Sequence, residues 1–432
     1  MIILRQGQRG PQVEMLQLAL NRTGYNAGPI DGVFGPNTLN AVLRFQSSRS
    51  LTQDGIVGPA TWNALRPYLV GYITYRIRAG DTLFRISTSR NIPLQTILIA
   101  NPNVSPANLI VGSELILPFS FDIVAENVTL TYELMELYIE GIVTRYPFVR
   151  SGILSTSSSG TRNIYNLVIG TGSNQVMYNA THHANEWITS LLLMKFIEQY
   201  AKAYAYGYNI AVGTPAETPA DLLYDYATIH FVPMVNPDGA DLVTGGILPN
   251  TELYNIARSI SQNYPDIPFP SGWKANIYGV DPTLQYPAGW TEARRIKFAQ
   301  GFTSPAPRDF VGYGPLTINE SIAMANYTRA NDFRLTLSYH TQGRVIYWKY
   351  LDYNPPNSEQ IGRLFANLSG YALEITPYES GHAGYKDWFI QDFNRPSYTI
   401  EAGLGTSPLP LSQFPTIYNE NRGILVMAAL VT

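Results

Sequence analysis

The apolar pattern of this 432-residue chain changes at Asp122, and this change constrains the fold more than any other feature. Up to that point, short apolar stretches are separated by turns that contain Gly and Pro. Beyond it, long amphipathic stretches alternate with runs that are apolar throughout, as in strands buried on both faces. We therefore expect residues 122–432 to form one α/β domain, with a mixed sheet flanked by helices, preceded by smaller modules.

The elements of this large domain are predicted from residue spacing. Apolar and β-branched runs predict strands at 165–170, 176–179, 228–235, 335–339, 344–348, 372–375 and 397–401. Helical spacing of apolar residues predicts helices at 131–146, 187–204, 317–331, 358–370 and 384–393. The sequence shows no internal boundary in this region, so a single domain is expected.

Residues 1–68 are predicted to form a small all-α bundle. Amphipathic stretches begin near Val13 and Leu39, and the near-repeat D-G-x-x-G-P-x-T occurs at 31–38 and again at 54–61. Each copy places a Gly turn and a Pro ahead of a Thr that can cap the next helix. These segments resemble the peptidoglycan-binding helical domain, and the resemblance implies binding to the bacterial cell wall.

Residues 72–118 are predicted to form a second small module with the order strand, helix, helix, strand. Residues 75–78 alternate as a strand, Thr82 can cap a first helix, and residues 93–100 suit a second one. The stretches AGDTLFRIS and ILIANPNV resemble a LysM domain, which implies a small α+β fold that binds glycan chains containing N-acetylglucosamine. As an alternative, either small module is an oligomerisation or spacer domain.

The composition limits the chemistry available to the chain. There is no Cys, which excludes disulfides, thiolate catalysis and iron–sulfur clusters. Any metal must therefore be bound by His and carboxylate ligands. The chain has five His, and all of them follow Asp122: His182, His183, His230, His340 and His382.

The charge is distributed unevenly along the chain. Residues 1–121 hold ten Arg, no Lys and five acidic residues, a net charge of +5, so the remainder carries −8 of the overall −3. A basic front suits an anionic partner, although two small modules can also be basic without one. No run approaches the roughly 18 apolar residues of a membrane span, and the four apolar residues before Arg5 are too few for a signal-peptide core of about 7–15. We expect no membrane span and no nucleic-acid partner, and the sequence does not indicate an oligomeric state.

Candidate chemical groups stand where the expected strands end. His183 and Glu186 lie one helical turn apart, just after a strand-like stretch that ends at Ala180. His340 ends one strand, and Glu401 ends another before a Gly. Open α/β sheets bind ligands at the carboxyl ends of their strands.

Together these groups suit a catalytic zinc site. Two His and one Glu form a three-ligand set that leaves a position for water, and a further carboxylate can take the proton of that water. Taken singly, the His183–Glu186 pair also suits a solvated surface pair, and Glu401 suits a structural role.

Seven ordered stretches resemble the zinc carboxypeptidase family: SSSGTRNIYNLVIG, HHANEW, FVPMVNPDG, GWKANIYGVD, LSYHTQG, GYKDW and YTIEAG. The resemblance implies that His183, Glu186 and His340 bind one Zn²⁺ ion and that Glu401 is the general base.

The same resemblance assigns three supporting residues. Asp281 matches the carboxylate that orients the first His ligand. Lys274 matches a basic residue that can stabilise the oxyanion, with a surface lysine as the alternative. Tyr378 is the nearest candidate for the mobile tyrosine of the family, offset by one residue. Among the other histidines, we expect His182 to pack beside the site and His230 to lie in the core, whereas His382 either borders substrate or has no role.

The sequence departs from the family shortly after Asp281. Carboxypeptidases carry Asn-Arg there, and the pair holds the terminal carboxylate of the substrate; here Thr283 and Leu284 occupy those places. Without the guanidinium no bidentate clamp can form, so removal of ordinary terminal residues is not expected, and Thr283 is expected to face another substrate. This departure is similar to the γ-D-glutamyl–L-diamino acid endopeptidase branch, which cuts bacterial wall peptides.

Two further cations are candidate substrate contacts. In the family, the residue before the Asp-Trp pair lines the pocket for the residue after the scissile bond, and here it is Lys386. A cation there suits the extra carboxylate of meso-diaminopimelate, unless Lys386 pairs with Asp387 instead. Arg344 is another candidate for substrate carboxylates.

The sequence therefore predicts a zinc endopeptidase that hydrolyses the γ-D-glutamyl–diamino acid bond of peptidoglycan stem peptides, held on its polymer by two binding modules. The alternatives are a wall-peptide carboxypeptidase, a muramoyl-peptide amidase on the same zinc site, or a wall-binding protein with a degenerate peptidase domain. The expected location is the bacterial cell wall or the spore.

Overall fold

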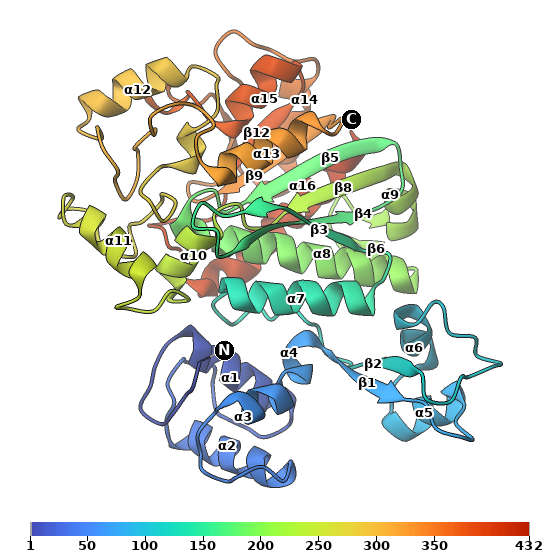
Figure 1. The fold of residues 1–432 in the computed structure, drawn as a ribbon. Coiled ribbons are helices and arrows are strands. Elements are labelled where there is room, and N and C mark those ends of the chain that lie inside the picture. Colours follow the sequence, from blue (N-terminus) through green and yellow to red (C-terminus); the bar gives the residue numbers. More distant parts are fainter. Residues whose placement is uncertain (1, 432) are drawn as a thin grey trace. The chain divides into compact units, whose positions relative to one another are not determined.

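The computed structural model describes residues 2–431, and the chain divides into two compact units, Met1–Arg150 and Ser151–Thr432. Figure 1 traces the chain through both units. The first unit contains helices α1 Pro11–Arg22, α2 Pro36–Ser48, α3 Pro59–Leu65 and α4 Pro67–Val70, then β1 Tyr72–Arg76, α5 Leu83–Arg90, α6 Leu94–Ala100, β2 Glu114–Pro118 and α7 Tyr132–Arg145.

Two buried glutamines hold the repeated turns of the first helical module. The amide of Gln17 donates to Asp31 Oδ1 (2.8 Å), and its oxygen accepts from the backbone N–H of Gly32 (3.0 Å). Gln46 makes the same two contacts with Asp54 Oδ1 (2.9 Å) and the N–H of Gly55 (3.1 Å). A side chain from the preceding helix therefore fixes each turn.

The expected caps by Thr38 and Thr61 were wrong. Helices α2 and α3 begin with Pro after Gly, without a side-chain cap. Both threonines are buried, and their hydroxyls accept from the amides of Gln17 (3.2 Å) and Gln46 (3.3 Å). The repeated motif therefore marks a turn that a glutamine binds. Its Thr hydroxyl accepts a hydrogen bond from the glutamine amide and does not cap the helix.

In the second module of this unit, β1 and β2 pair antiparallel and α5 and α6 connect them, as the sequence predicts. Thr82 caps α5 by accepting from the N–H of Arg85 (3.1 Å). Arg145, in the last turn of α7, donates to the carbonyls of Gly71 (3.0 Å), Phe119 (2.6 Å) and Phe121 (2.9 Å). One guanidinium therefore ties α7 to both ends of this module.

Over the described residues, the second unit is built on an eight-stranded sheet of order β11-β10-β12-β9-β5-β8-β4-β3. Its strands are β3 Arg150–Thr156, β4 Asn163–Ile169, β5 Asn174–Ala180, β8 Ala227–Val232, β9 Leu335–His340, β10 Val345–Tyr347, β11 Ala372–Glu374 and β12 Ser397–Glu401. Strands β8, β5, β9 and β12 run parallel, whereas β4 and β10 run antiparallel to their neighbours β8 and β12. The mixed sheet that the sequence predicts is thereby confirmed.

Alternate residues of the central strands face different helices, since side chains point to opposite faces of a strand in turn. On β5, the hydroxyl of Tyr178 donates to the carbonyl of Leu425 in α16 (2.9 Å), and its ring meets Phe231 of β8. Its neighbour Met177 belongs to an apolar cluster with residues of α13 and α15, among them Met324 and Phe389. Helices therefore cover both faces of the sheet (Figure 1).

The remaining elements of this unit are α8 Ile188–Tyr206, β6 Asn209–Ile210, β7 Thr218–Pro219, α9 Ala220–Tyr226, α10 Pro237–Thr244, α11 Glu252–Ser261, α12 Trp290–Ala299, α13 Asn319–Arg329, α14 Ser358–Ser369, α15 Tyr385–Phe393 and α16 Phe414–Leu430, with short 3₁₀ turns. The sequence did not predict β3, β6, β7, α9–α12 or α16. Strand β3 is mostly exposed and lacks apolar alternation, and α16 begins at a Pro-containing turn and holds an internal Gly. Within residues 2–431, no helix has the length and apolarity that crossing a membrane requires.

The glutamine contacts predict the stability of the first module. Replacing Gln17 by Leu removes its hydrogen bonds and leaves the buried N–H of Gly32 without its acceptor. We expect the opening free energy of residues 11–48 to fall by about 2–4 kcal/mol. Native-state hydrogen exchange followed by mass spectrometry measures it. The control is Gln53→Leu at an exposed position of the same module, and an equal effect of the two substitutions would contradict the prediction.

Candidate metal centre

Three parallel strands bring the candidate site residues to one edge of the sheet. In the register of the sheet, Glu401 of β12 pairs with His340 of β9, and Tyr339 pairs with Ala180 at the end of β5. The backbone N–H of Ala402 continues this pairing by donating to the carbonyl of His340 (2.8 Å). Because parallel strands end at the same edge, the residues at and just after their carboxyl ends meet there.

A strained residue turns the chain out of β5 toward the site. Thr181 has a φ of 55°, in the left-handed region that a β-branched residue seldom adopts. Its N–H donates to Thr189 Oγ1 (3.1 Å), and its hydroxyl lies 2.6 Å from the hydroxyl of Ser190. The first turn of α8 thus holds this conformation, which is typical of a functional position.

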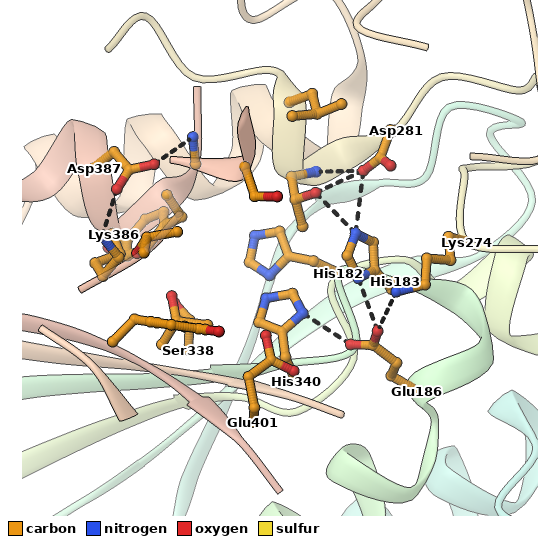
Figure 2. Close-up of a pocket in the computed structure, with 18 of the residues that line it drawn as sticks. His182, His183, Glu186, Lys274, Asp281, Ser338, His340, Lys386, Asp387 and Glu401 are labelled. Carbon is orange, nitrogen blue, oxygen red and sulfur yellow. Dashed lines mark hydrogen bonds and ion pairs between the residues drawn. The ribbon is translucent and has the colours of Figure 1, made fainter. Parts of the chain in front are cut away.

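His183, Glu186 and His340 form one cluster (Figure 2). Glu186 Oε1 lies 2.9 Å from His183 Nδ1, and Glu186 Oε2 lies 2.8 Å from His340 Nδ1. One candidate ligand atom from each residue lies within 4.8 Å of the others. Two imidazoles and one carboxylate match the donor set of catalytic zinc sites, so these residues fit the metal.

The outer nitrogen of His183 is also held. His183 Nε2 lies 2.8 Å from Thr283 Oγ1 and 3.3 Å from Asp281 Oδ1. The hydroxyl of Thr283 donates to Asp281 Oδ1 (2.7 Å), so it is free to accept the Nε2 proton of His183. In the neutral ring, that proton position leaves the Nδ1 lone pair facing the cluster, as a metal ligand requires. The hydroxyl of Thr283, which we expected to face substrate, is therefore engaged in orienting a histidine.

The Glu186 carboxylate forms ion pairs with basic groups of the site. Lys274 Nζ lies 2.9 Å from Glu186 Oε1. Burial lowers the pKa of Lys274, but the Glu186 carboxylate outweighs this effect and raises the pKa above its ordinary value. Burial lowers the pKa of His183 as well, and the Glu186 and Asp281 carboxylates raise it to about 9. Lys274, whose side chain is 17% exposed, is therefore a partly buried cation of the cluster and not a surface lysine.

Glu401 lies in the same pocket and has a different environment. Burial raises its pKa above the ordinary value, while His340 and Lys274 act in the opposite direction. A carboxyl group whose pKa is raised toward the working pH can both accept and return a proton.

The pocket around this cluster encloses about 380 Å³. Lys386 and Asp387 line it and lie across from the cluster in Figure 2. Both side chains are buried and form an ion pair, and Lys386 Nζ also donates to the carbonyl of Lys349 (2.9 Å). The alternative stated from the sequence, a Lys386–Asp387 pair, is thus present, and contact between Lys386 and substrate stays a prediction.

Two residues that the sequence assigned to the site, Tyr378 and Arg344, do not line this pocket. Tyr378 is 54% exposed, and its hydroxyl donates to Glu292 Oε1 (3.0 Å). Arg344 lies 2.8 Å from Glu420 Oε1, and its guanidinium lies over the ring of Tyr371. Each polar group is bound to another residue in this structure, so the roles expected for Tyr378 and Arg344 stay predictions.

The other histidines have partners outside the cluster. His182 is buried, and its Nε2 lies 2.9 Å from the hydroxyl of Tyr286, so it packs beside the site. His230 Nδ1 lies 2.5 Å from the hydroxyl of Tyr327 in the core. His382 is buried against the rings of Tyr350 and Tyr378.

The sequence analysis missed three charged residues of the pocket, Lys297, Arg308 and Asp309. They lie on α12 and in the loop that follows it, outside any recognisable motif. The adjacent opposite charges of Arg308 and Asp309 were the only signal, and adjacent charges are common on surfaces.

The fold and the cluster define a class: an α/β domain with a His-Glu-His cluster, suited to a metal ion, at the carboxyl edge of a mixed sheet. The zinc carboxypeptidase family model matches residues 135–423, and the chain belongs to this family of zinc metallopeptidases. A peptidoglycan binding domain model matches residues 9–65, and a LysM domain model matches residues 75–118. The family resemblances seen in the sequence are confirmed.

Individual relatives agree with this assignment. The chain is 40% identical over 402 residues to γ-D-glutamyl-L-diamino acid endopeptidase 1 of Lysinibacillus sphaericus, covering 81% of this chain and 98% of that protein. The crystal structure of thrombin-activatable fibrinolysis inhibitor aligns with a TM-score of 0.55 at 15% identity, over 84% of this chain and 98% of that one. Carboxypeptidase A of Helicoverpa armigera aligns with a TM-score of 0.51 at 17% identity, over 80% and 81%. These two structures share the fold.

The cluster predicts the metal content of the purified protein. His340→Ala removes one of the three ligands, and we expect bound zinc to fall from about one equivalent to near zero. Asp281→Asn leaves the ligands in place but weakens the hold on the His183 ring, so zinc affinity should fall about 10- to 100-fold. Inductively coupled plasma mass spectrometry and competition with a chelating dye measure these two quantities.

Thr283 supplies the matched control. Thr283→Ser keeps the hydroxyl between His183 and Asp281 and should keep the zinc affinity, whereas Thr283→Val should weaken it. Equal affinities of the Ser and Val variants would show that the hydroxyl does not orient the histidine.

Proposed function

We propose that this protein is a zinc-dependent endopeptidase that hydrolyses the γ-D-glutamyl–diamino acid bond of peptidoglycan stem peptides. The observation that carries the proposal is an intact metal cluster combined with the loss of the terminal-carboxylate clamp. Where the family holds Asn-Arg, this chain has Thr283, which is bound to His183 and Asp281, and the apolar Leu284. A substrate therefore need not end at the residue after the scissile bond. The activity of the relative from Lysinibacillus sphaericus, as named, supports the same bond.

The proposed roles follow from the positions of the side chains. His183, Glu186 and His340 hold one zinc ion, which when bound supplies Lewis-acid activation of the scissile carbonyl and of the attacking water. Glu401 accepts a proton from that water and returns it to the departing amine as the C–N bond breaks. Lys274 keeps a positive charge beside the reacting carbonyl, where it stabilises the negative charge that develops on the oxygen.

The N-terminal modules supply the second part of the function. We assign the peptidoglycan-binding domain to residues 1–68, the LysM domain to 72–118 and the catalytic domain to 122–432. Binding of wall glycan by the first two keeps the catalytic domain at a high local concentration of stem peptides. The proposed location is the bacterial cell wall, including that of the spore.

The first test is the identity of the products. L-Ala-γ-D-Glu-meso-diaminopimelate stem peptide is incubated with the full chain, with and without a zinc chelator, and the products are identified by mass spectrometry. We expect L-Ala-D-Glu to be released only without the chelator. Chelator-sensitive cleavage at another bond would favour a wall-peptide carboxypeptidase or an amidase, and an intact peptide would favour a wall-binding protein without activity.

The second test separates catalysis from metal binding. Glu401→Gln removes the proton acceptor without removing a ligand, so kcat should fall about 10²- to 10⁴-fold while the zinc content stays the same. The matched control is Glu374→Gln, an exposed carboxylate of β11 in the same sheet, which should leave kcat unchanged. Loss of zinc from the Glu401 variant would refute the assigned role.

A further inference from the structure

A second cavity adjoins the metal pocket. It encloses about 540 Å³, and it shares four lining residues with the metal pocket: Lys274, Arg308, Thr341 and Gln342. Lys386 and Asp387 line only the first pocket. Figure 2 shows Lys386 on one side of the metal cluster and Lys274, which lines both cavities, on the other. A stem peptide lying across the cluster can therefore extend toward Lys386 in one direction and into the second cavity in the other.

Arg308 lines both cavities, and its ion pair with Asp309 is shared with a second cation. Its Nε donates to Asp309 Oδ2 (2.6 Å), while Lys297 Nζ lies 2.6 Å from Asp309 Oδ1. Two cations thus share one carboxylate. Within residues 2–431, Arg308 donates a hydrogen bond to the Asp309 carboxylate through Nε. Its two terminal nitrogens therefore remain able to donate to a ligand.

The other cations that line the metal pocket are engaged. Lys274 lies against Glu186, Lys386 against Asp387, and Lys297 against Asp309. A guanidinium with both terminal nitrogens available can bind a carboxylate in bidentate fashion, which an ammonium cannot do.

Backbone contacts fix Arg308 relative to the metal cluster. The N–H of Asp309 donates to Asp281 Oδ2 (3.0 Å), the carboxylate that also orients His183. The carbonyl of Pro307 accepts from the N–H groups of Lys274 (2.7 Å) and Ala275 (2.9 Å). The residues on both sides of Arg308 are therefore tied to the loops that bear Asp281 and Lys274.

The structure assigns Arg308 as a specificity-determining residue that binds the free α-carboxylate of the D-glutamyl residue. This inference rests on the proposed function. In a γ-linked D-glutamyl residue the α-carboxylate lies three carbons from the scissile carbonyl, whereas an ordinary α-linked residue has no carboxylate on its backbone there. The other free carboxylates of the tetrapeptide substrate, at the far end of the diaminopimelate side chain and on the terminal D-Ala, both lie on the departing-amine side of the scissile bond.

The test compares two substrates that differ only at this carboxylate: L-Ala-γ-D-Glu-meso-diaminopimelate-D-Ala and its counterpart with D-isoglutamine, in which the α-carboxylate is an amide. For the wild-type chain we expect kcat/KM to be about 10- to 100-fold higher with the acid, since hydrogen bonds between charged groups are the strong ones. Arg308→Gln should reduce this preference to within about threefold by lowering the rate on the acid alone, and Arg308→Lys should retain part of it.

The control variant is Arg295→Gln, an exposed arginine of α12 that lines neither cavity, and it should keep the full preference. Zinc content and calorimetric titration with L-Ala-D-Glu show whether the Arg308 variants are folded and whether they have lost the carboxylate contact. Equal losses on the two substrates, or an unchanged preference, would overturn the assignment of Arg308 alone. Failure of the wild-type chain to cleave either substrate would overturn the proposed function together with it.

Discussion

The second unit of the structure depends on the buried carboxylate of Glu186. It meets a nitrogen of His183, a nitrogen of His340, the ammonium of Lys274 and the backbone N–H of Thr341. Burial of a carboxylate is unfavourable without such partners, and these partners keep the pKa of Glu186 well below its ordinary value. Three separate segments of chain are thus required to meet at one anion, and the carboxyl edge of the sheet is where they meet.

The strands supply the precision of this arrangement. His340 and Glu401 stand side by side because β9 and β12 are parallel and in register. His183 reaches the same place only because Thr181 is held in a left-handed conformation by hydroxyl groups of α8. Regular secondary structure therefore places two of the groups, and one strained residue places the third.

The sequence predicted those parts of the site that depend on local position. His183, Glu186, His340 and Glu401 stand next to strand ends that apolar runs reveal. The roles of Thr283, Lys386 and Arg308 depend on partners that periodicity does not reveal. Thr283 contacts a histidine 100 residues away in the sequence. Lys386 pairs with its neighbour Asp387 and with a carbonyl of another segment. Arg308 is recognised as a candidate only because it lines two adjoining cavities. Helices such as α11 and α12 were not predicted because they lie between loops. The helices of this unit that were predicted were recognised from their alternation with apolar strands, which is missing here.

The paired glutamines of the first module have a consequence for how such a module can vary. Gln17 reaches a turn 14 residues further along the chain, whereas Gln46 reaches the equivalent turn after only 8 residues. Both turns nevertheless present the same donors and acceptors to the glutamine. The connecting segment can therefore lengthen or shorten while the anchored turn is kept, so a change of loop length is compatible with the same framework.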